Sequence, residues 1–241
     1  ASCLVGSEMC IRDRYKDEEE RQRMREASLI NDECMNMVIH AIREGVTEKE
    51  LALKVENFFK ARGCNSLGFS IVGMGKNGAD PHHDADETVL KEGDSIVIDI
   101  GAPFNHYWCD MTRTVFYKSV SEKQREVYET VRRANEAAIA KIKPGVAFKE
   151  FDLAARKVIE DAGYGEYFTH RTGHSIGMKE HEKPPVASDC EVIARPGMVF
   201  SIEPGIYLPG QFGVRVEDLV LVTEDGCEVL NKYTKDLIVV E

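Results

Sequence analysis

Two aspartates stand on the two predicted strands of one hairpin. Asp99 ends an apolar run over residues 95–98, which is typical of a buried strand, and Asp110 follows on the returning strand. A buried carboxylate is costly unless a partner compensates its charge. Each of these side chains therefore needs a partner that the rest of the sequence must explain.

Two glutamates and one histidine occur later in the chain. Glu203 lies in SIEPG, Glu217 in VRVED and His174 in TGHSIG. Four carboxylates in one pocket would repel one another, so divalent cations are their natural partners. One imidazole among carboxylates, with room for two ions, favours manganese, iron, cobalt or zinc over calcium.

The elements that would carry these residues follow from hydrophobic periodicity and capping signals. Apolar residues at steps of three and four predict a helix over residues 16–43, and another helix is expected over residues 148–162, ended by Gly163. Thr47 caps a second helix that ends at Gly63, and Ser121 with Gln124 forms a capping box for a third. Strands are expected near residues 67–73, 94–100, 106–117, 198–203, 212–223 and 226–240.

The same order of elements occurs twice. IREGVTEKEL at residues 42–51 parallels IKPGVAFKEF at 142–151, and LKEGDSIVIDIG at 90–101 parallels ARPGMVFSIEPG at 194–205. In this alignment Gly93 matches Gly197, and Asp99 matches Glu203. The period is too long for a solenoid repeat. We therefore expect two helix–helix–strand halves that face each other across a pseudo-twofold axis and bring equivalent strand ends together.

Two further motifs match familiar patterns without the context that those patterns need. GMGKNG at residues 73–78 fits G-x-G-x-x-G, but that fingerprint must open a helix, and Pro81 follows too soon. GHSIG fits the G-x-S-x-G nucleophile elbow, but no helix start follows Ser175. We therefore assign neither a nucleotide site nor a serine nucleophile.

Composition limits the class of protein. The chain has 241 residues, 43% of them hydrophobic and 30% charged, and its net charge of −11 argues against a nucleic-acid partner. No apolar run approaches the roughly 18–20 residues of a membrane span, so we expect no membrane partner. The seven cysteines form no C-x-x-C pair, which favours free thiols in a reducing, cytoplasmic compartment. We interpret residues 1–14 as a non-native leader before one domain at residues 15–241.

The segments IDIG, CDMTRT, GHSIG, SIEPGIY and VRVED together resemble the pita-bread metallopeptidases, in particular the Xaa-Pro aminopeptidases and Xaa-Pro dipeptidases. The resemblance covers residues 16–241 and implies the catalytic domain of that branch. The implied fold is α+β, with two pseudo-symmetric halves around a curved antiparallel sheet. The implied centre is dinuclear, with manganese as the first choice: Asp99 chelates one metal, His174 and Glu203 hold the other, and Asp110 and Glu217 bridge both.

The resemblance also implies catalytic residues beside the metals. His82 lies in DPHHDAD and His181 in HEKPP, and both match active-site histidines of the family, with His82 preferred over His83. Glu203 would take a proton from the attacking water and pass it to the leaving nitrogen. A histidine and the metals would stabilise the tetrahedral oxyanion.

Three more residues are predicted to contact the substrate, a proline-containing peptide: His170, Tyr207 and Arg215. Arg215 could instead only orient carboxylates. Two other classes remain open: a methionine aminopeptidase with the same fold and metals, and a peptide-binding relative without catalysis. The flanks of Glu217 in VRVED favour the Xaa-Pro branch, and the presence of all five ligands argues against the non-catalytic class. A homodimer is also open.

Overall fold

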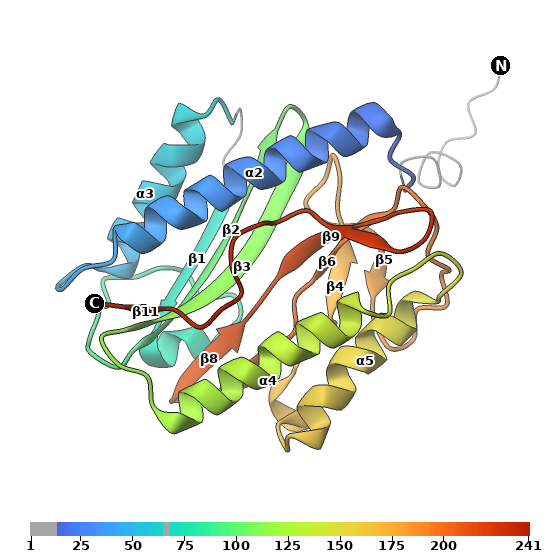
Figure 1. The fold of residues 1–241 in the computed structure, drawn as a ribbon. Helices are drawn as coiled ribbons and strands as arrows, with labels where there is room; N and C mark the ends of the chain where they lie inside the picture. The colour runs from blue at the N-terminus through green and yellow to red at the C-terminus, as the bar shows by residue number, and fades with distance from the viewer. Residues whose placement is uncertain (1–13, 65–67) are drawn as a thin grey trace.

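The computed structural model describes residues 14–64 and 68–241. Two helices lie over one group of strands, and a second pair of helices lies beside another group (Figure 1). The C-terminal segment, drawn in red, runs between helices α2 and α4 (Figure 1). This mixture of helices and mainly antiparallel strands confirms the predicted α+β class.

The first half contains α2 (Glu18–His40), α3 (Glu48–Ala61), β1 (Phe69–Met74), β2 (Ser95–Phe104) and β3 (Tyr107–Tyr117). Capping boxes begin both helices, because Asp17 and Thr47 each exchange hydrogen bonds with a glutamate three residues later. The helices bury their apolar faces, including Val38, Leu51 and Val55, against β1–β3. The order of the four-stranded sheet is β1-β2-β3-β11, where β11 (Val239–Val240) pairs parallel to β3.

The second half begins with α4 (Glu122–Ile139) and α5 (Phe148–Asp161). Its five-stranded sheet has the order β10-β9-β6-β4-β5, and β7 and β8 form a separate pair. The core beneath the helices includes Phe148, Phe151 and Phe200, whose rings contact one another. The strands are β4 (Gly173–Ser175), β5 (Glu182–Val186), β6 (Val199–Ile202), β7 (Gly205–Leu208), β8 (Phe212–Arg215), β9 (Asp218–Val222) and β10 (Cys227–Val229).

The two halves repeat each other in detail, as the sequence predicted. An isolated bridge joins Thr47 to Val89 in the first half, and the equivalent bridge joins Ala147 to Ile193 in the second. Three glycine pairs at matching positions share a left-handed backbone: Gly45 and Gly145, Gly63 and Gly163, and Gly93 and Gly197. The repeat is therefore structural: β2 and β6 begin at matching positions, although β2 continues past Asp99 to Phe104 and β6 ends before Glu203.

Two predicted strands are wrong in extent. The predicted strand at residues 212–223 divides into β8 and β9, which belong to different sheets, with Val216 and Glu217 between them. The predicted strand at residues 226–240 contains only β10 and β11, because the chain crosses there from the five-stranded sheet to the four-stranded one. The sequence prediction also missed the short strands β4, β5 and β7.

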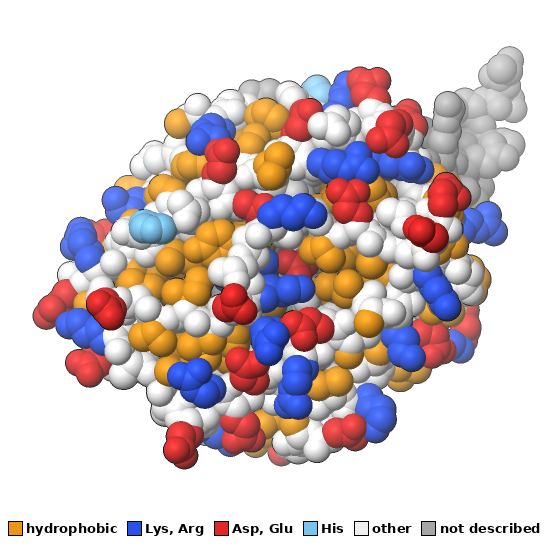
Figure 2. Space-filling model, in the orientation of Figure 1, with side chains coloured by type: hydrophobic (Ala, Val, Ile, Leu, Met, Phe, Trp, Pro, Cys, Tyr) orange, Lys and Arg blue, Asp and Glu red, His pale blue; other side chains and the backbone are white. Residues whose placement is uncertain are grey.

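The leader, the cysteines and the expected absence of a membrane span were also predicted from the sequence. The predicted leader at residues 1–14 lies outside the described residues except for Arg14. The five cysteines within the described ranges are all free thiols. No helix in the described part of the chain is long and apolar enough to cross a membrane. On the face shown in Figure 2, acidic and basic side chains are interspersed.

Candidate active site

All five predicted metal ligands line one cavity of about 750 Å³. The cavity receives residues from both halves of the fold, as the pseudo-twofold arrangement requires. The ligands that it gathers are Asp99, Asp110, His174, Glu203 and Glu217. His82, His170, His181 and Arg215 also line it, whereas Tyr207 is not among its lining residues.

The β2–β3 hairpin brings the two aspartates to one face. Asp99 pairs with Thr112, and Asp110 pairs with Gly101 two positions away on both strands. Because directly paired residues share a face and side chains alternate, Asp99, Asp110 and Thr112 all point to the cavity side. The backbone N–H of Glu217 donates to the Thr112 carbonyl at 3.1 Å, which brings the irregular residue before β9 beside them.

The second half positions His174 and Glu203 by close packing of β4 and β6. Only glycine fits at position 173, because a Cβ there would lie 2.0 Å from the Ser201 carbonyl oxygen. The Ser201 hydroxyl accepts a hydrogen bond from the His174 backbone and donates one to Glu203 Oε1, both at 3.0 Å. Thr172 lies just before Gly173 in the chain. Its N–H and its hydroxyl both donate to Oδ1 of Asp152, a buried residue of α5.

Three of the five ligands have ligand-type atoms within 4.8 Å of one another: Asp110, His174 and Glu217. His174 Nε2 lies 3.6 Å from Asp110 Oδ2 and 3.5 Å from Glu203 Oε1. Among the described residues, Oδ1 of Asp99 and Oδ1 of Asp110 are buried without a hydrogen-bond partner. Buried polar atoms normally have partners, so these oxygens fit a site built for cations.

The pKa values of the acids in this cluster also indicate a site that lacks positive charge. Burial raises the pKa of Asp110 well above its usual range, and the neighbouring charges of Asp99 and Glu203 raise it further. Burial, Asp110 and Glu203 likewise raise the pKa of Glu217. Burial raises the pKa of Asp99, although Arg215 opposes that shift. Without added positive charge, these acids are driven toward their protonated forms.

Arg215 is held by protein groups on all sides. Its Nη2 donates to Asp99 Oδ2 at 2.6 Å, its Nε to the Thr112 hydroxyl at 3.0 Å, and its Nη1 to the Tyr207 hydroxyl at 2.8 Å. The Tyr207 hydroxyl also pairs with His170 Nε2 at 2.8 Å, and burial raises the pKa of Tyr207 to about 12. These hydrogen bonds connect Asp99, through Arg215 and Tyr207, to His170. Such a network fits a role of Arg215 and Tyr207 in orienting the side chains at its two ends.

The structure separates the histidines clearly. His82 and His181 are exposed and line the cavity, whereas His83 turns away and pairs with Glu48 at 2.7 Å. The His181 ring lies against that of His174, with 4.0 Å between the ring centres. The His181 ring is only partly buried, and this partial burial together with the charge of His174 lowers the pKa of His181 to about 4, so its imidazole is neutral at neutral pH.

Sequence reasoning missed some polar residues of the site. Thr112 donates its hydroxyl to Glu217 Oε2 at 2.7 Å, and Glu180 also lines the cavity. Strand alternation could have found Thr112, because it lies two residues after Asp110 on the same predicted strand and therefore on the same face. Nothing in the sequence singles out Glu180, since it lies in the loop before β5.

The two unassigned motifs have structural roles. GMGKNG forms the end of β1 and a short 3-10 helix, η1 (Gly75–Ala79), and opens no α-helix. Its Gly78 is packed so closely against β8 that a Cβ on Gly213 would lie 1.8 Å from the Gly78 carbonyl oxygen. Ser175 in GHSIG lies on β4 and donates its hydroxyl to the Pro184 carbonyl at 2.7 Å. This contact is that of a structural hydroxyl.

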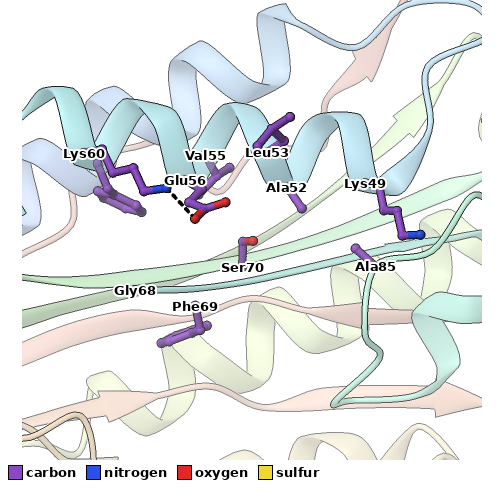
Figure 3. A pocket seen from close by; sticks show the side chains of 11 residues that line it. Lys49, Ala52, Leu53, Val55, Glu56, Lys60, Gly68, Phe69, Ser70 and Ala85 are labelled. Atoms are coloured by element: carbon purple, nitrogen blue, oxygen red, sulfur yellow. Dashed lines mark hydrogen bonds and ion pairs between the residues drawn. The ribbon is translucent and has the colours of Figure 1, made fainter. Parts of the chain in front are cut away.

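A second hollow lies between α3 and the edge of β1 (Figure 3). Its lining is largely apolar, with Leu53, Ala52 and Phe69 among its residues. Lys60 donates to Glu56 at 2.7 Å, as the dashed line in Figure 3 marks, and Lys49 at the other end of the groove donates to Glu87 at 2.8 Å. This groove lacks the concentration of acids and imidazoles found in the first cavity, so the chemistry belongs to the first.

The fold and the cavity define a class: an α+β protein of the pita-bread type with a carboxylate-rich site for cations between its halves. The chain belongs to metallopeptidase family M24, whose sequence pattern is matched by residues 22–224. This membership confirms the family and the fold expected from the five sequence segments.

Relatives of known sequence and structure agree with this family. An Xaa-Pro dipeptidase of Pyrococcus furiosus is 42% identical over 224 residues, which are 92% of this chain and 64% of that protein. The prolidase structure from Pyrococcus horikoshii is 41% identical with a TM-score of 0.93, covering 95% of this chain and 67% of that one. The X-Pro aminopeptidase structure from Thermotoga maritima is 37% identical, also with a TM-score of 0.93, covering 97% and 66%. The chain thus spans less than two thirds of the length of the Pyrococcus furiosus dipeptidase.

Proposed function

We propose that this chain is the catalytic domain of a dinuclear-metal peptidase. Its substrate would be the Xaa-Pro bond at the N-terminus of a peptide or within an Xaa-Pro dipeptide. The observation that carries the proposal is the buried group of Asp110, His174 and Glu217 at one cavity, with ligand atoms within 4.8 Å. Support for proline comes from the relatives, which are named for dipeptidase and aminopeptidase action on X-Pro bonds.

The five acidic and imidazole side chains would hold two divalent cations, with manganese as the proposed metal. When bound, the cations supply Lewis acidity that activates water and polarises the scissile carbonyl. The Oδ1 atoms of Asp99 and Asp110 are buried without a hydrogen-bond partner in the described part of the chain, and bound cations would satisfy them. Arg215 fixes the other oxygen of Asp99, so this carboxylate is already oriented before a cation arrives.

Glu203 is the proposed proton carrier. Its side chain is 18% exposed, compared with 5% for Asp110, so it can reach substrate in the cavity. The Ser201 hydroxyl donates to Oε1 and holds the carboxylate in one orientation. From there the carboxylate can take a proton from the attacking water and transfer it to the leaving nitrogen.

His181 and His82 are the proposed donors to the oxyanion. A neutral imidazole carries one N–H, and the lowered pKa of His181 keeps its ring neutral at neutral pH. Such an N–H can donate to the carbonyl oxygen as negative charge develops on it. The prolyl nitrogen has no N–H, so a peptidase cannot hold this bond through a backbone hydrogen bond from that nitrogen. A site whose groups act on the carbonyl oxygen and on the leaving nitrogen does not need that hydrogen bond.

The test is hydrolysis of Ala-Pro, Ala-Pro-Ala and Met-Ala-Ser by the manganese-loaded protein. The variant Glu203→Gln, purified in parallel, reports any contaminating peptidase. Release of alanine from Ala-Pro alone indicates a dipeptidase, and release from Ala-Pro-Ala indicates an aminopeptidase. Cleavage of Met-Ala-Ser with both proline peptides intact would replace the proposal by methionine removal. No cleavage of any peptide, with binding retained, would favour a non-catalytic relative.

Two further expectations accompany this proposal. The free thiols of the described cysteines are compatible with the predicted cytoplasmic location. A homodimer also stays a prediction, to be measured by light scattering on the purified chain.

A further inference from the structure

A buried acid outside the cavity anchors several segments of the first half. Glu48 is the first residue of α3, and its side chain is 0% exposed. Its Oε1 accepts hydrogen bonds from the Met74 N–H at 2.7 Å and from Asn77 Nδ2 at 3.0 Å. Its Oε2 pairs with His83 Nε2 at 2.7 Å and accepts from the Asp86 N–H at 3.1 Å.

This group has ligand-type atoms but not the character of a metal site. Glu48, His83 and Asp86 offer atoms within 4.8 Å of one another. However, His83 and Glu48 already contact each other directly, and both oxygens of Glu48 are occupied by donors from the protein. The orphaned oxygens that mark the cation site at Asp99 and Asp110 have no counterpart here in the described chain. The carboxylate is therefore a structural acceptor.

The donors to Glu48 belong to the segments on both sides of His82. Met74 ends β1, Asn77 lies in η1, and His83 and Asp86 lie in the loop that follows. Within the described chain, the imidazole of His82 has no hydrogen bond of its own; only its backbone N–H is held, by Asp80 Oδ1 at 3.0 Å. The position of His82 in the cavity thus depends on how its loop is held.

We propose that Glu48 is a positioning residue for His82, acting through His83 and the surrounding loop. Adjacent histidines would then have opposite tasks: His83 faces inward and pairs with Glu48, and His82 faces the cavity. The proposal rests on the proposed function, because His82 must act on the substrate for its position to matter. Displacement of a catalytic group by about 1 Å can cost on the order of 100-fold in rate.

The test compares Glu48→Gln with Glu56→Gln, a matched change on the same helix at a side chain that pairs with Lys60 at the surface. Glutamine keeps the shape but presents one acceptor oxygen and an NH₂ group to four donors. We expect kcat of the manganese-loaded E48Q enzyme on the proline peptide to fall about 10- to 100-fold. KM and bound manganese should stay within about twofold of wild type, and E56Q should match wild type.

A double-mutant cycle with His82→Ala separates positioning from a general loss of structure. If Glu48 acts through His82, then adding E48Q to H82A should lower kcat less than about twofold further. A full additional loss in the double variant, or an unchanged kcat in E48Q alone, would overturn the proposal. Should E48Q fail to fold, His83→Ala removes one of the four contacts and must show the same dependence on His82, partly restored in His83→Gln.

Hydrogen exchange gives a readout that needs no activity. The amides of Met74 and Asp86 donate to Glu48, so E48Q should accelerate exchange in residues 74–86 by about tenfold or more, and E56Q should not. Unchanged exchange there contradicts the anchoring by Glu48. Accelerated exchange together with an inactive wild type, or with a fully active H82A, would instead contradict the proposed function or the role of His82.

Discussion

Replacing Asp110 by asparagine should stabilise the metal-free protein while removing most of its response to manganese. Asp110 is 3% exposed, its Oδ1 has no hydrogen-bond partner among the described residues, and other acids surround it. Asparagine keeps the shape, removes one negative charge and adds an N–H that can donate to a neighbouring carboxylate. Sites built for function commonly sacrifice stability in this way.

The magnitude follows from the geometry. Ligand atoms of Asp110 and Glu217 lie within 4.8 Å, and two full charges at that distance repel by about 3 kcal/mol at an effective dielectric constant near 20. Partial protonation relieves some of this repulsion, so we expect a gain of about 1–3 kcal/mol in the free energy of unfolding. For a chain of this size that corresponds to a rise of about 3–10 °C in melting temperature.

The assay is thermal unfolding in a chelator and again with manganese. Without metal, Asp110→Asn should melt above wild type at about pH 8. The raised pKa of Asp110 means that the folded chain binds its proton more tightly than the unfolded chain does. Asp110 therefore lowers the free energy of unfolding least at low pH, where it is protonated, and most at pH values above its raised pKa. The difference in melting temperature between D110N and wild type should accordingly shrink toward about pH 5. Manganese should stabilise wild type and have little effect on D110N.

The exposed residue Asp189 provides a matched control variant. Asp189 is exposed, so Asp189→Asn makes the same chemical change without relieving buried repulsion and should shift the free energy of unfolding by less than about 0.5 kcal/mol. A D110N protein that melts below wild type in the chelator would refute the reasoning. A D110N protein with the full manganese response would show that Asp110 is not a ligand.

The remaining predictions concern turnover and packing. Glu203→Gln should lower kcat at least about 100-fold while elemental analysis still finds manganese, and loss of the metal instead would show that the fall in kcat comes from metal binding rather than from proton transfer. Asp218→Asn weakens the buried ion pair that Asp218 forms with Arg113 at 2.7 Å. It should lower the free energy of unfolding, measured in urea, by about 3 kcal/mol, and a decrease below about 1 kcal/mol would contradict this. Gly173→Ala places a Cβ against the Ser201 carbonyl and should cost about 1–3 kcal/mol and weaken manganese binding in a titration, whereas unchanged melting would show that β4 can move.

Features that depend on neighbours in the chain could be predicted from the sequence. The first helix appears where apolar residues recur at steps of three and four, Thr47 caps the second helix as expected, and the expected capping box begins the third at Ser121. The duplication was visible because each half repeats the same local signals, down to Gly93 and Gly197. Strand alternation predicted that Asp110 and Thr112 share a face, because a period of two depends only on the strand itself; the register of the β2–β3 hairpin then puts Asp99 on that face.

What the sequence could not decide depends on partners distant in the chain. The segment at residues 212–223 has the composition of one strand, and only its pairing with β7 and then β6 divides it at Glu217. In the irregular loop at residues 80–86 no periodicity says which histidine faces the cavity; the buried carboxylate of Glu48, on α3, selects His83 for the interior. Arg215 likewise contacts Asp99 across 116 positions of sequence. Alternation and capping are local, whereas the choice of partner for a buried charge is made only when the two halves pack together.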